Sequence, residues 1–549
     1  MRRGPGVSTH AARAAREPAA GRGPSAGRRR AALYWAVTIA AVTAVLAFCY
    51  LRIAGTTPVV SDGAANAMQA WDMFHGDPLL HGWYVTDVSF YTTELPEYGL
   101  VEAVAGLRPE VVHICAALTY TLLVLLAAAV ARGRERGPAG LARALLAAGV
   151  MLAPEPGDAT GVLLGAPDHV GAAVPVLLVM LLLDWARPRW YIPVAVGVVL
   201  AVAAVGEPLI LLVGVLPVVA VCLARTCAAL VRRVPPRAVW FELSLACAAA
   251  LAVPAALAGD RLIRLLGGYS TNKNPARLAP LSALPGNIPM TARSVLALFG
   301  ADYWSARGTL NHVFAVIHLA GAALVLAAIA LGAWRLVRTL GAAREPDGPA
   351  DLVAGLLVTA VIVNIAAYFL LYRIRHVPYA AHEIGPVVSL GAALTGRMLG
   401  GPLLRARLLP ALAAGLACYC AMLGFAAARP QAAPANAAVA SWLVSHGLRS
   451  GIAPYWEATS VTLDSGGTIA MGSVLPARGG LAPWHWEEDM RVFKHGHSAN
   501  FLLTSPGESV TPALAAHTFG RPAKIYHYQG YTIMVWHKNL VPHLGRPVP

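Results

Sequence analysis

The sequence predicts an all-α polytopic membrane protein of about eleven transmembrane helices, with a C-terminal extracytoplasmic α/β domain. Three observations support this fold class. Of the 549 residues, 57% are apolar and only 13% are charged, whereas charged residues make up roughly 25% of a soluble domain. The mean hydropathy is +0.58. Long apolar runs follow one another to about residue 428, and the chain beyond them is polar. Most of this chain therefore requires lipid as its solvent.

The N-terminal segment, residues 1–30, carries eight Arg among many Gly, Ala and Pro. Such a composition cannot bury a core, so we expect a disordered basic tail in the cytoplasm. The apolar run from Ala31 to about Ile53 follows it. This run is too long for a signal peptide and predicts the first spanning helix.

The transmembrane domain is expected over residues 31–429. Ten further apolar runs predict its other helices, centred roughly on 110–131, 140–153, 169–186, 191–206, 208–225, 238–258, 313–334, 351–372, 384–400 and 407–428. Arginines fill the connections after the even-numbered helices, whereas those after the third and fifth helices hold Glu155, Asp158 and Glu207. The positive-inside rule then places the N-terminus in the cytoplasm and the C-terminus outside. The basic residues that give the net charge of +15 follow this pattern along the chain. We therefore expect a lipid bilayer and no nucleic acid as partner. All seven Cys lie in or beside apolar runs and indicate no disulfide framework.

Three outer segments are long: 54–109, 259–312 and the tail 430–549. The tail predicts a small α/β domain. Ala438–His446 has the pattern of an amphipathic helix. Two hairpins are expected, the first around Gly466-Gly467, between Val461–Leu463 and Thr468–Met471, and the second around Gln529-Gly530, between Lys524–Tyr528 and Tyr531–Trp536.

The first outer segment carries an acid directly after the first helix. Asp62 precedes a short helix expected over Ala65–Phe74, in which Trp71 would anchor the chain at the membrane surface, and Gly76-Asp77-Pro78 then forms a turn. An acid at the lipid boundary costs free energy to desolvate, so its presence indicates a function. The alternative is that Asp62 only caps the following helix.

At these residues the sequence resembles the GT-C glycosyltransferases, in a bacterial, actinobacterial-like branch. The matching positions are Asp62, Ala70, Met73, Gly76 and Asp77. Two further stretches are similar, Arg373 to Pro386 and Gly451–Ala458. At Gly63 and Asn66 the chain departs from the pattern, where many relatives have a second acid and an aromatic residue.

The resemblance implies transfer of a sugar from a polyprenyl-phosphate donor to an envelope glycan, lipid or protein acceptor on the outer face. Such a transfer needs a base for the acceptor proton, for which Asp62 is the first candidate; the secondary candidates are Asp87, Glu94 and Glu97. It also needs positively charged side chains that bind the donor phosphate. The candidates for that role are Arg373, Arg375 and His376, with contact to lipid headgroups as the alternative.

Aromatic side chains accompany the candidate acids. Phe90, Tyr91 and Tyr98 are expected to form a shelf for a sugar or an interfacial aromatic belt. No cofactor is assigned. A divalent metal ion stays an alternative because the chain has three acid–His pairs, although none has the spacing of a metal motif. The pairs are Asp72 with His75, Asp168 with His169, and His382 with Glu383.

Two other functions are compatible with this composition. The first is a transporter or lipid flippase, which predicts paired broken helices in two related halves. The second is a non-catalytic envelope assembly protein with the same fold. A lipid-linked sugar transfer assay separates the three.

Overall fold

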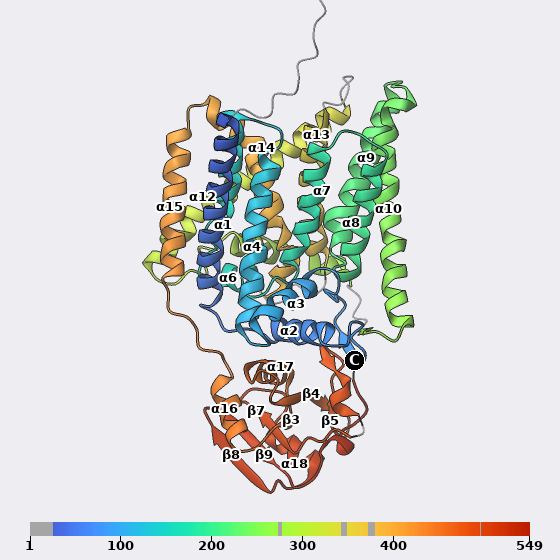
Figure 1. The fold of residues 1–549 in the computed structure, drawn as a ribbon, viewed down its shortest axis with the longest axis vertical. Coiled ribbons are helices and arrows are strands. Elements are labelled where there is room, and N and C mark those ends of the chain that lie inside the picture. The colour runs from blue at the N-terminus through green and yellow to red at the C-terminus, as the bar shows by residue number, and fades with distance from the viewer. Residues whose placement is uncertain (1–25, 273–276, 342–347, 372–378, 495, 549) are drawn as a thin grey trace, which may run out of the picture. The chain divides into compact units, whose positions relative to one another are not determined.

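A computed structural model describes residues 26–272, 277–341, 348–371, 379–494 and 496–548 (Figure 1). The chain divides into two compact units, Met1–Leu46 and Ala47–Pro549. Residues 1–25 of the expected basic tail lie outside the described residues, whereas residues 26–30 belong to the first helix. The expected phosphate-binding residues Arg373, Arg375 and His376 also lie outside them.

The described chain is mostly helical. Its α-helices are α1 Ala26–Ala54, α2 Ser61–Phe74, α3 Glu94–Ala105, α4 Glu110–Arg132, α5 Gly137–Met151, α6 Asp158–Leu163, α7 Ala173–Trp185, α8 Tyr191–Gly206, α9 Leu216–Val231, α10 Pro236–Leu265, α11 Leu284–Leu298, α12 Thr309–Gly341, α13 Gly348–Leu370, α14 Pro386–Arg405, α15 Leu409–Ala427, α16 Ala437–Ser445, α17 Tyr455–Asp464 and α18 Pro512–Phe519. Short 3-10 or π segments are η1 Val170–Ala172, η2 Leu211–Val215, η3 Leu281–Ala283, η4 Tyr379–Ile384, η5 Met490–Phe493 and η6 Val541–His543. The strands are β1 Trp83–Val85, β2 Ser270–Thr271, β3 Ser450–Ala453, β4 Ala470–Ala477, β5 Gly480–Pro483, β6 Glu488–Asp489, β7 Phe501–Thr504, β8 Lys524–Tyr528 and β9 Tyr531–Val535.

Among the described residues, eight helices are long and apolar enough to cross a membrane, and three shorter apolar helices accompany them, Gly137–Met151, Val170–Trp185 and Tyr191–Gly206. They correspond one by one to the eleven apolar runs of the sequence. The prediction of a polytopic helical protein is therefore confirmed. Periodicity did not reveal α11, which lies within the second long segment between α10 and α12.

The strands of the tail form a mixed six-stranded sheet with the order β5-β4-β3-β7-β9-β8 (Figure 1). The expected hairpin at Gln529-Gly530 is confirmed, because β8 and β9 pair antiparallel across these two residues. Both have positive φ, 46° and 86°, which a tight two-residue hairpin turn requires. The other expected hairpin is wrong. Val461–Leu463 lie inside α17, and Gly466-Gly467 joins this helix to β4.

Helix α2 of the first long segment is buried along most of its length. Its alanines, among them Ala64, Ala67 and Ala70, are fully buried and pack in one cluster with residues of α3 and α4. Small side chains allow the helix to lie close to its neighbours, and α2 also packs against α17 of the tail domain. The helix therefore lies between the bundle and the tail domain, as Figure 1 shows.

A second, three-stranded sheet takes one strand from each of the three long segments. Its order is β2-β1-β6: Tyr84 pairs with Ser270 in parallel and with Glu488 antiparallel. The strands are only two or three residues long, too short to be stable alone. Neighbouring side-chain contacts must hold them together.

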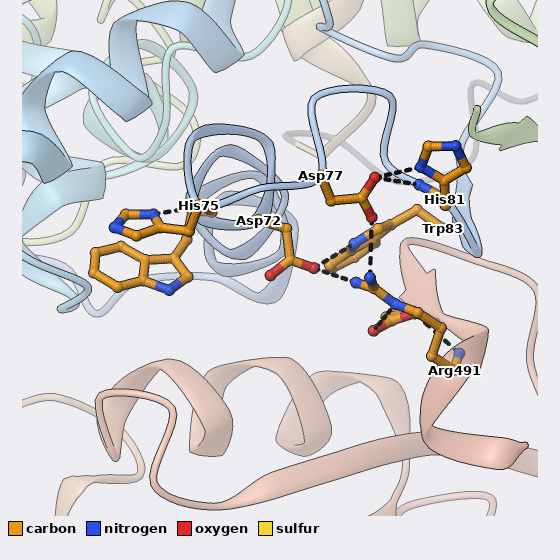
Figure 2. Close-up of polar contacts among 8 residues, drawn as sticks. Asp72, His75, Asp77, His81, Trp83 and Arg491 are labelled. Carbon is orange, nitrogen blue, oxygen red and sulfur yellow. Dashed lines mark hydrogen bonds and ion pairs between the residues drawn. The ribbon is translucent and has the colours of Figure 1, made fainter. Parts of the chain in front are cut away.

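Arg491 supplies the strongest of these contacts (Figure 2). Its guanidinium group reaches Asp72 at 2.5 Å, Asp77 at 2.9 Å and its neighbour Asp489 at 2.8 Å. The indole nitrogen of Trp83 donates to the same Asp72 carboxylate. We call Arg491 with Asp72, Asp77 and Asp489 the arginine clamp. It joins the tail domain to the end of α2 and to the turn that follows this helix.

We predict that Arg491→Ala loosens the tail domain. The arginine is about one-third exposed, so solvent screens each ion pair, and the loss is expected at about 1–2 kcal/mol. Arg491→Lys keeps the charge but lacks the planar fork and should recover only part of it. The measurement is the melting temperature of the purified protein, with the exposed arginine Arg521 replaced by Ala as the control. An unchanged melting temperature in Arg491→Ala would contradict this role.

Candidate functional site

Asp62 lies in the first turn of α2 and faces the tail domain. Its Oδ1 accepts a hydrogen bond of 2.6 Å from the hydroxyl group of Tyr455, the first residue of α17. The N-cap of α2 is Val60, and no side chain caps this helix. The alternative that Asp62 serves only as a helix cap is therefore wrong.

The Tyr455 hydroxyl also contacts a second acid, because it lies within hydrogen-bond distance of Glu487 Oε2. A phenol carries one proton and can donate it to only one acceptor. If Tyr455 donates to Asp62, then Glu487 must carry its own proton and donate it to the phenol oxygen. The three groups then form a chain of two hydrogen bonds that leaves Asp62 ionised.

Burial sets the ionisation of these groups. It raises the pKa of Asp62, while the hydrogen bond from Tyr455 and the charge of His169 lower it again in part. The pKa of Glu487 lies well above its usual range because this carboxyl group is buried and Asp62 is close. The raised pKa favours the protonated form of Glu487, which is the form that the hydrogen-bond chain requires.

Asp168 is a further, partly buried acid near Asp62. Burial, together with the negative charge of Asp62, raises its pKa to about 7. The side-chain amide of Asn66 donates to Asp168 Oδ1 at 2.9 Å. Asn66, where the chain departs from the family pattern, thus holds this second carboxylate.

His169 follows directly and forms an ion pair with Glu207, with 3.0 Å between Nδ1 and Oε2. Although burial lowers the pKa of His169, the charge of Glu207 raises it to about 9, so the ring is positively charged at neutral pH. The ring stacks on His382 at 4.9 Å. The backbone of His169 has a φ of 56°, a conformation that costs non-glycine residues roughly 1–3 kcal/mol and is typical of functional sites.

The secondary acids separate in the structure. Glu94 is buried beside Gly171, and burial with the charge of Glu207 raises its pKa well above the usual range. Glu97 accepts a hydrogen bond from Thr119 of α4, and burial raises its pKa to about 7. Asp87 is exposed, and its charge acts on Glu487. Glu94 thus joins the acids around His169, and Asp87 lies on the side of Glu487.

The expected sugar shelf is contradicted for two of its three rings. Phe90 and Tyr98 are 4% and 0% exposed and belong to the packed core of the first segment. Phe90 touches the edge of His169. Tyr91 is half-buried, and its hydroxyl group donates to the carbonyl group of Pro78. Core packing explains Phe90 and Tyr98, whereas contact of a sugar with Tyr91 stays a prediction.

The acid–His pairs do not assemble into a metal site. Within the ranges that the structure describes, no group of three or more His, Cys, Asp or Glu side chains is placed to hold a metal ion. Figure 2 shows Asp72 directed to Arg491, while His75 stacks on Trp71 on the other side of α2. Within the part of the chain that the structure describes, the three acid–His pairs therefore form no metal site.

Gly63 marks the other departure from the family pattern. A Cβ atom at this position would lie 2.7 Å from Val112 Cγ1 and 3.3 Å from Ala166 Cβ. An acid at position 63 has no room. Asp168 therefore supplies the second carboxylate of the site from a different segment.

We define the acid site by the residues that these contacts join: Asp62, Asn66, Asp168, His169, Glu207, Tyr455 and Glu487. Sequence reasoning proposed Asp62 but missed the roles of Tyr455 and Glu487. The contact between Tyr455 and Asp62 joins residues 393 positions apart, and no local pattern encodes it. The adjacent pair Asp168-His169 was the one usable signal for the rest of the site.

The chain resembles solved structures in its fold. No protein-family model and no curated protein sequence matches it. The crystal structure of ArnT from Cupriavidus metallidurans bound to undecaprenyl phosphate superposes with a TM-score of 0.50 and 15% identity, over 91% of this chain and 97% of ArnT. The fold is similar to that of ArnT. The oligosaccharyltransferase AglB from Archaeoglobus fulgidus, in complex with an inhibitory peptide and a dolichol-phosphate, matches with a TM-score of 0.44 and 11% identity, over 86% of this chain and 69% of that chain.

The ArnT-like fold agrees with the resemblance seen in the first outer segment. ArnT is matched over 91% of this chain, so the similarity extends from the helical bundle into the tail domain. At 15% identity this likeness shows the fold alone.

We predict that Gly63→Asp destabilises the protein by about 1–3 kcal/mol, because the new side chain overpacks the contact with Val112 and Ala166. The measurement is the melting temperature. Gly161→Asp is the matched control: this helical glycine has no atom within 4 Å of the added Cβ, so the substitution should cost little. Equal melting temperatures for the two variants would show that position 63 tolerates an acid.

Proposed function

We propose that this protein is a membrane glycosyltransferase that moves a sugar from a polyprenyl-phosphate donor to an envelope acceptor on the extracytoplasmic face. The observation that carries the proposal is the Asp62 carboxyl group, which accepts a hydrogen bond from Tyr455 between the helical bundle and the tail domain. The ArnT-like fold supports the donor class, since that structure was solved with undecaprenyl phosphate. The alternation of arginines in the sequence supports the orientation.

The proposed reaction is a direct displacement with inversion at the sugar carbon. The oxygen of an acceptor hydroxyl group attacks the anomeric carbon and forms the new glycosidic bond. The bond between this carbon and the phosphate oxygen breaks, and its electron pair leaves with polyprenyl phosphate. The hydroxyl proton passes to Asp62.

Asp62 suits the role of base because burial raises its pKa above the usual range of a carboxyl group. A base is most effective when its pKa lies near the working pH. Tyr455 and Glu487 act as positioning residues: they orient the carboxylate and hold down its pKa through the Tyr455 hydrogen bond.

The negative charge of the leaving phosphate must be stabilised by a positively charged side chain. We propose His169 for this role within the described residues, since its ring is charged and its charge already acts on Asp62 and Asp168. Arg373, Arg375 and His376 remain our proposal from the sequence for the same phosphate. Charged donors form hydrogen bonds to phosphate that are about twice as strong as neutral ones.

We predict that Asp62→Asn lowers the transfer rate ~10²–10⁴-fold, the usual contribution of a general base. The amide oxygen still accepts a hydrogen bond from Tyr455, so the melting temperature should change little. The measurement is transfer from a polyprenyl-phosphate sugar by purified protein. Asp260→Asn is the control, because Asp260 pairs with Arg264 on α10, outside the acid site. If Asp62→Asn transfers sugar at the parental rate, the base must be sought among Asp168, Asp87, Glu94 and Glu97.

We predict a second effect on the pH profile of transfer. The hydrogen bond from Tyr455 lowers the pKa of Asp62, so Tyr455→Phe raises it. Because the base works when ionised, the acidic limb of the rate profile should move to higher pH, and the rate should recover as pH rises further. Glu487→Gln keeps the Tyr455 hydroxyl group and should move the limb less. A limb that stays in place in Tyr455→Phe would exclude Asp62 as the group that titrates.

A further inference from the structure

Two partly buried tryptophans of the tail domain lie next to the acid site. Trp484 packs edge-to-face against the Tyr455 ring with 5.4 Å between centroids, and Trp486 stacks on Trp484 at 5.7 Å with 15° between the planes. We call Trp484 and Trp486 the aromatic platform. It lies one ring away from the hydroxyl group that binds Asp62.

The backbone holds this platform in place. The amide group of Trp484 donates to Ser473, and that of His485 donates to Val548. The amide of Asn272, from the second long segment, donates to the carbonyl group of His485. Three separate parts of the chain thus fix a loop that would otherwise be mobile.

The side chains alternate along this stretch, as they do in extended backbone. His485 faces away from the platform and stacks on Tyr84 of β1 at 3.8 Å with 4° between the planes. Trp484 and Trp486 share the other face. Glu487 follows with a φ of 46°, a left-handed conformation that non-glycine residues rarely adopt, and its side chain reaches Tyr455. The chain bends so that both the platform and this carboxyl group meet Tyr455.

The chemistry of this surface is that of a carbohydrate subsite. Indole faces are large, rigid and apolar, and they suit the C–H faces of sugar rings. Glu487 follows Trp486 in the chain and is buried against Tyr455. The exposed carboxylate of Asp87, whose charge acts on Glu487, offers acceptors for sugar hydroxyl groups. A few polar groups on an aromatic wall are typical of small-molecule sites.

We infer that the aromatic platform binds a sugar ring of the acceptor glycan, an assignment that rests on the proposed function. The platform belongs to the tail domain, whereas the lipid of the donor must lie along the membrane helices. A sugar stacked on Trp484 and Trp486 lies on the side of Asp62 from which Tyr455 approaches. The acceptor hydroxyl group would thus meet its base from the tail-domain side.

The first test is binding, with the purified full chain and methyl glycosides of glucose, mannose, galactose and arabinose as probes in calorimetric titrations. Trp484→Ala and Trp486→Ala are expected to weaken the binding of the preferred glycoside about tenfold or more, a usual effect of truncating a tryptophan at the centre of a binding site. Trp484→Phe keeps a ring and should retain most of the affinity. Trp190→Ala is the control, because this exposed tryptophan directly precedes α8. The other end of α8, at Gly206, accepts a hydrogen bond from the backbone of Phe90 near the acid site. The 16 residues of α8 thus separate Trp190 from the acid site by ~24 Å.

The second test is transfer, with the same glycosides as acceptors. The expected result is a raised KM for the acceptor with an unchanged KM for the polyprenyl-phosphate sugar. A KM effect on the donor instead would overturn the acceptor assignment. Tetramethylammonium chloride, a cation without hydroxyl groups, should not displace the glycoside; displacement would overturn the sugar assignment.

The two tests keep this inference apart from the proposed function. Tryptophan-dependent binding of glycosides without any transfer supports the platform and contradicts the transferase. Transfer and binding that are unchanged in well-folded Trp484→Ala and Trp486→Ala variants contradict the platform and leave the transferase in place. Melting temperatures of all variants show which of them are folded.

Discussion

A single hydroxyl proton organises the site of this protein. Tyr455 faces Asp62 on one side and Glu487 on the other, and it has only one proton to give. Two ionised carboxylates around one phenol would repel each other in a buried setting, so one of them must stay neutral. The more deeply buried Glu487 takes that role. The charge of Asp62 therefore depends on a group that a different part of the chain supplies.

This dependence explains why the tail domain must dock firmly. The small sheet of β2, β1 and β6 joins three segments with strands of two or three residues, which hold little free energy of their own. The arginine clamp lies where β6 ends and binds the carboxylates at the end of α2 (Figure 2). The same helix carries Asp62 in its first turn. One end of α2 is thus fixed by charge, and the other end presents the candidate base.

The sequence predicted the spanning helices well. In lipid the backbone must satisfy its hydrogen bonds within each helix, and the side chains that face lipid must be apolar, so each spanning helix is visible in the sequence as a long apolar run. It also predicted the hairpin at Gln529-Gly530, where local turn chemistry decides. Local signals failed where tertiary contacts decide. Val461–Leu463 follow a strand-like pattern but lie in α17, and Phe90 and Tyr98 fill a core rather than a shelf. Asp62 could be proposed because it stands alone at a membrane boundary, whereas its partnership with Tyr455 and Glu487 arises only when distant segments meet.

The separation of Asp62 from Tyr455 by 393 residues has a consequence for how the protein is made. Synthesis proceeds from the N-terminus, so the helical bundle and α2 leave the ribosome before the tail domain exists. Throughout that interval Asp62 lacks the hydroxyl group that orients it. A chain that is still growing thus cannot contain the assembled acid site. The acid site is therefore complete only when the tail domain has folded and Tyr455 reaches Asp62. Degradation of chains with a misfolded tail domain would remove the chains in which the acid site is incomplete.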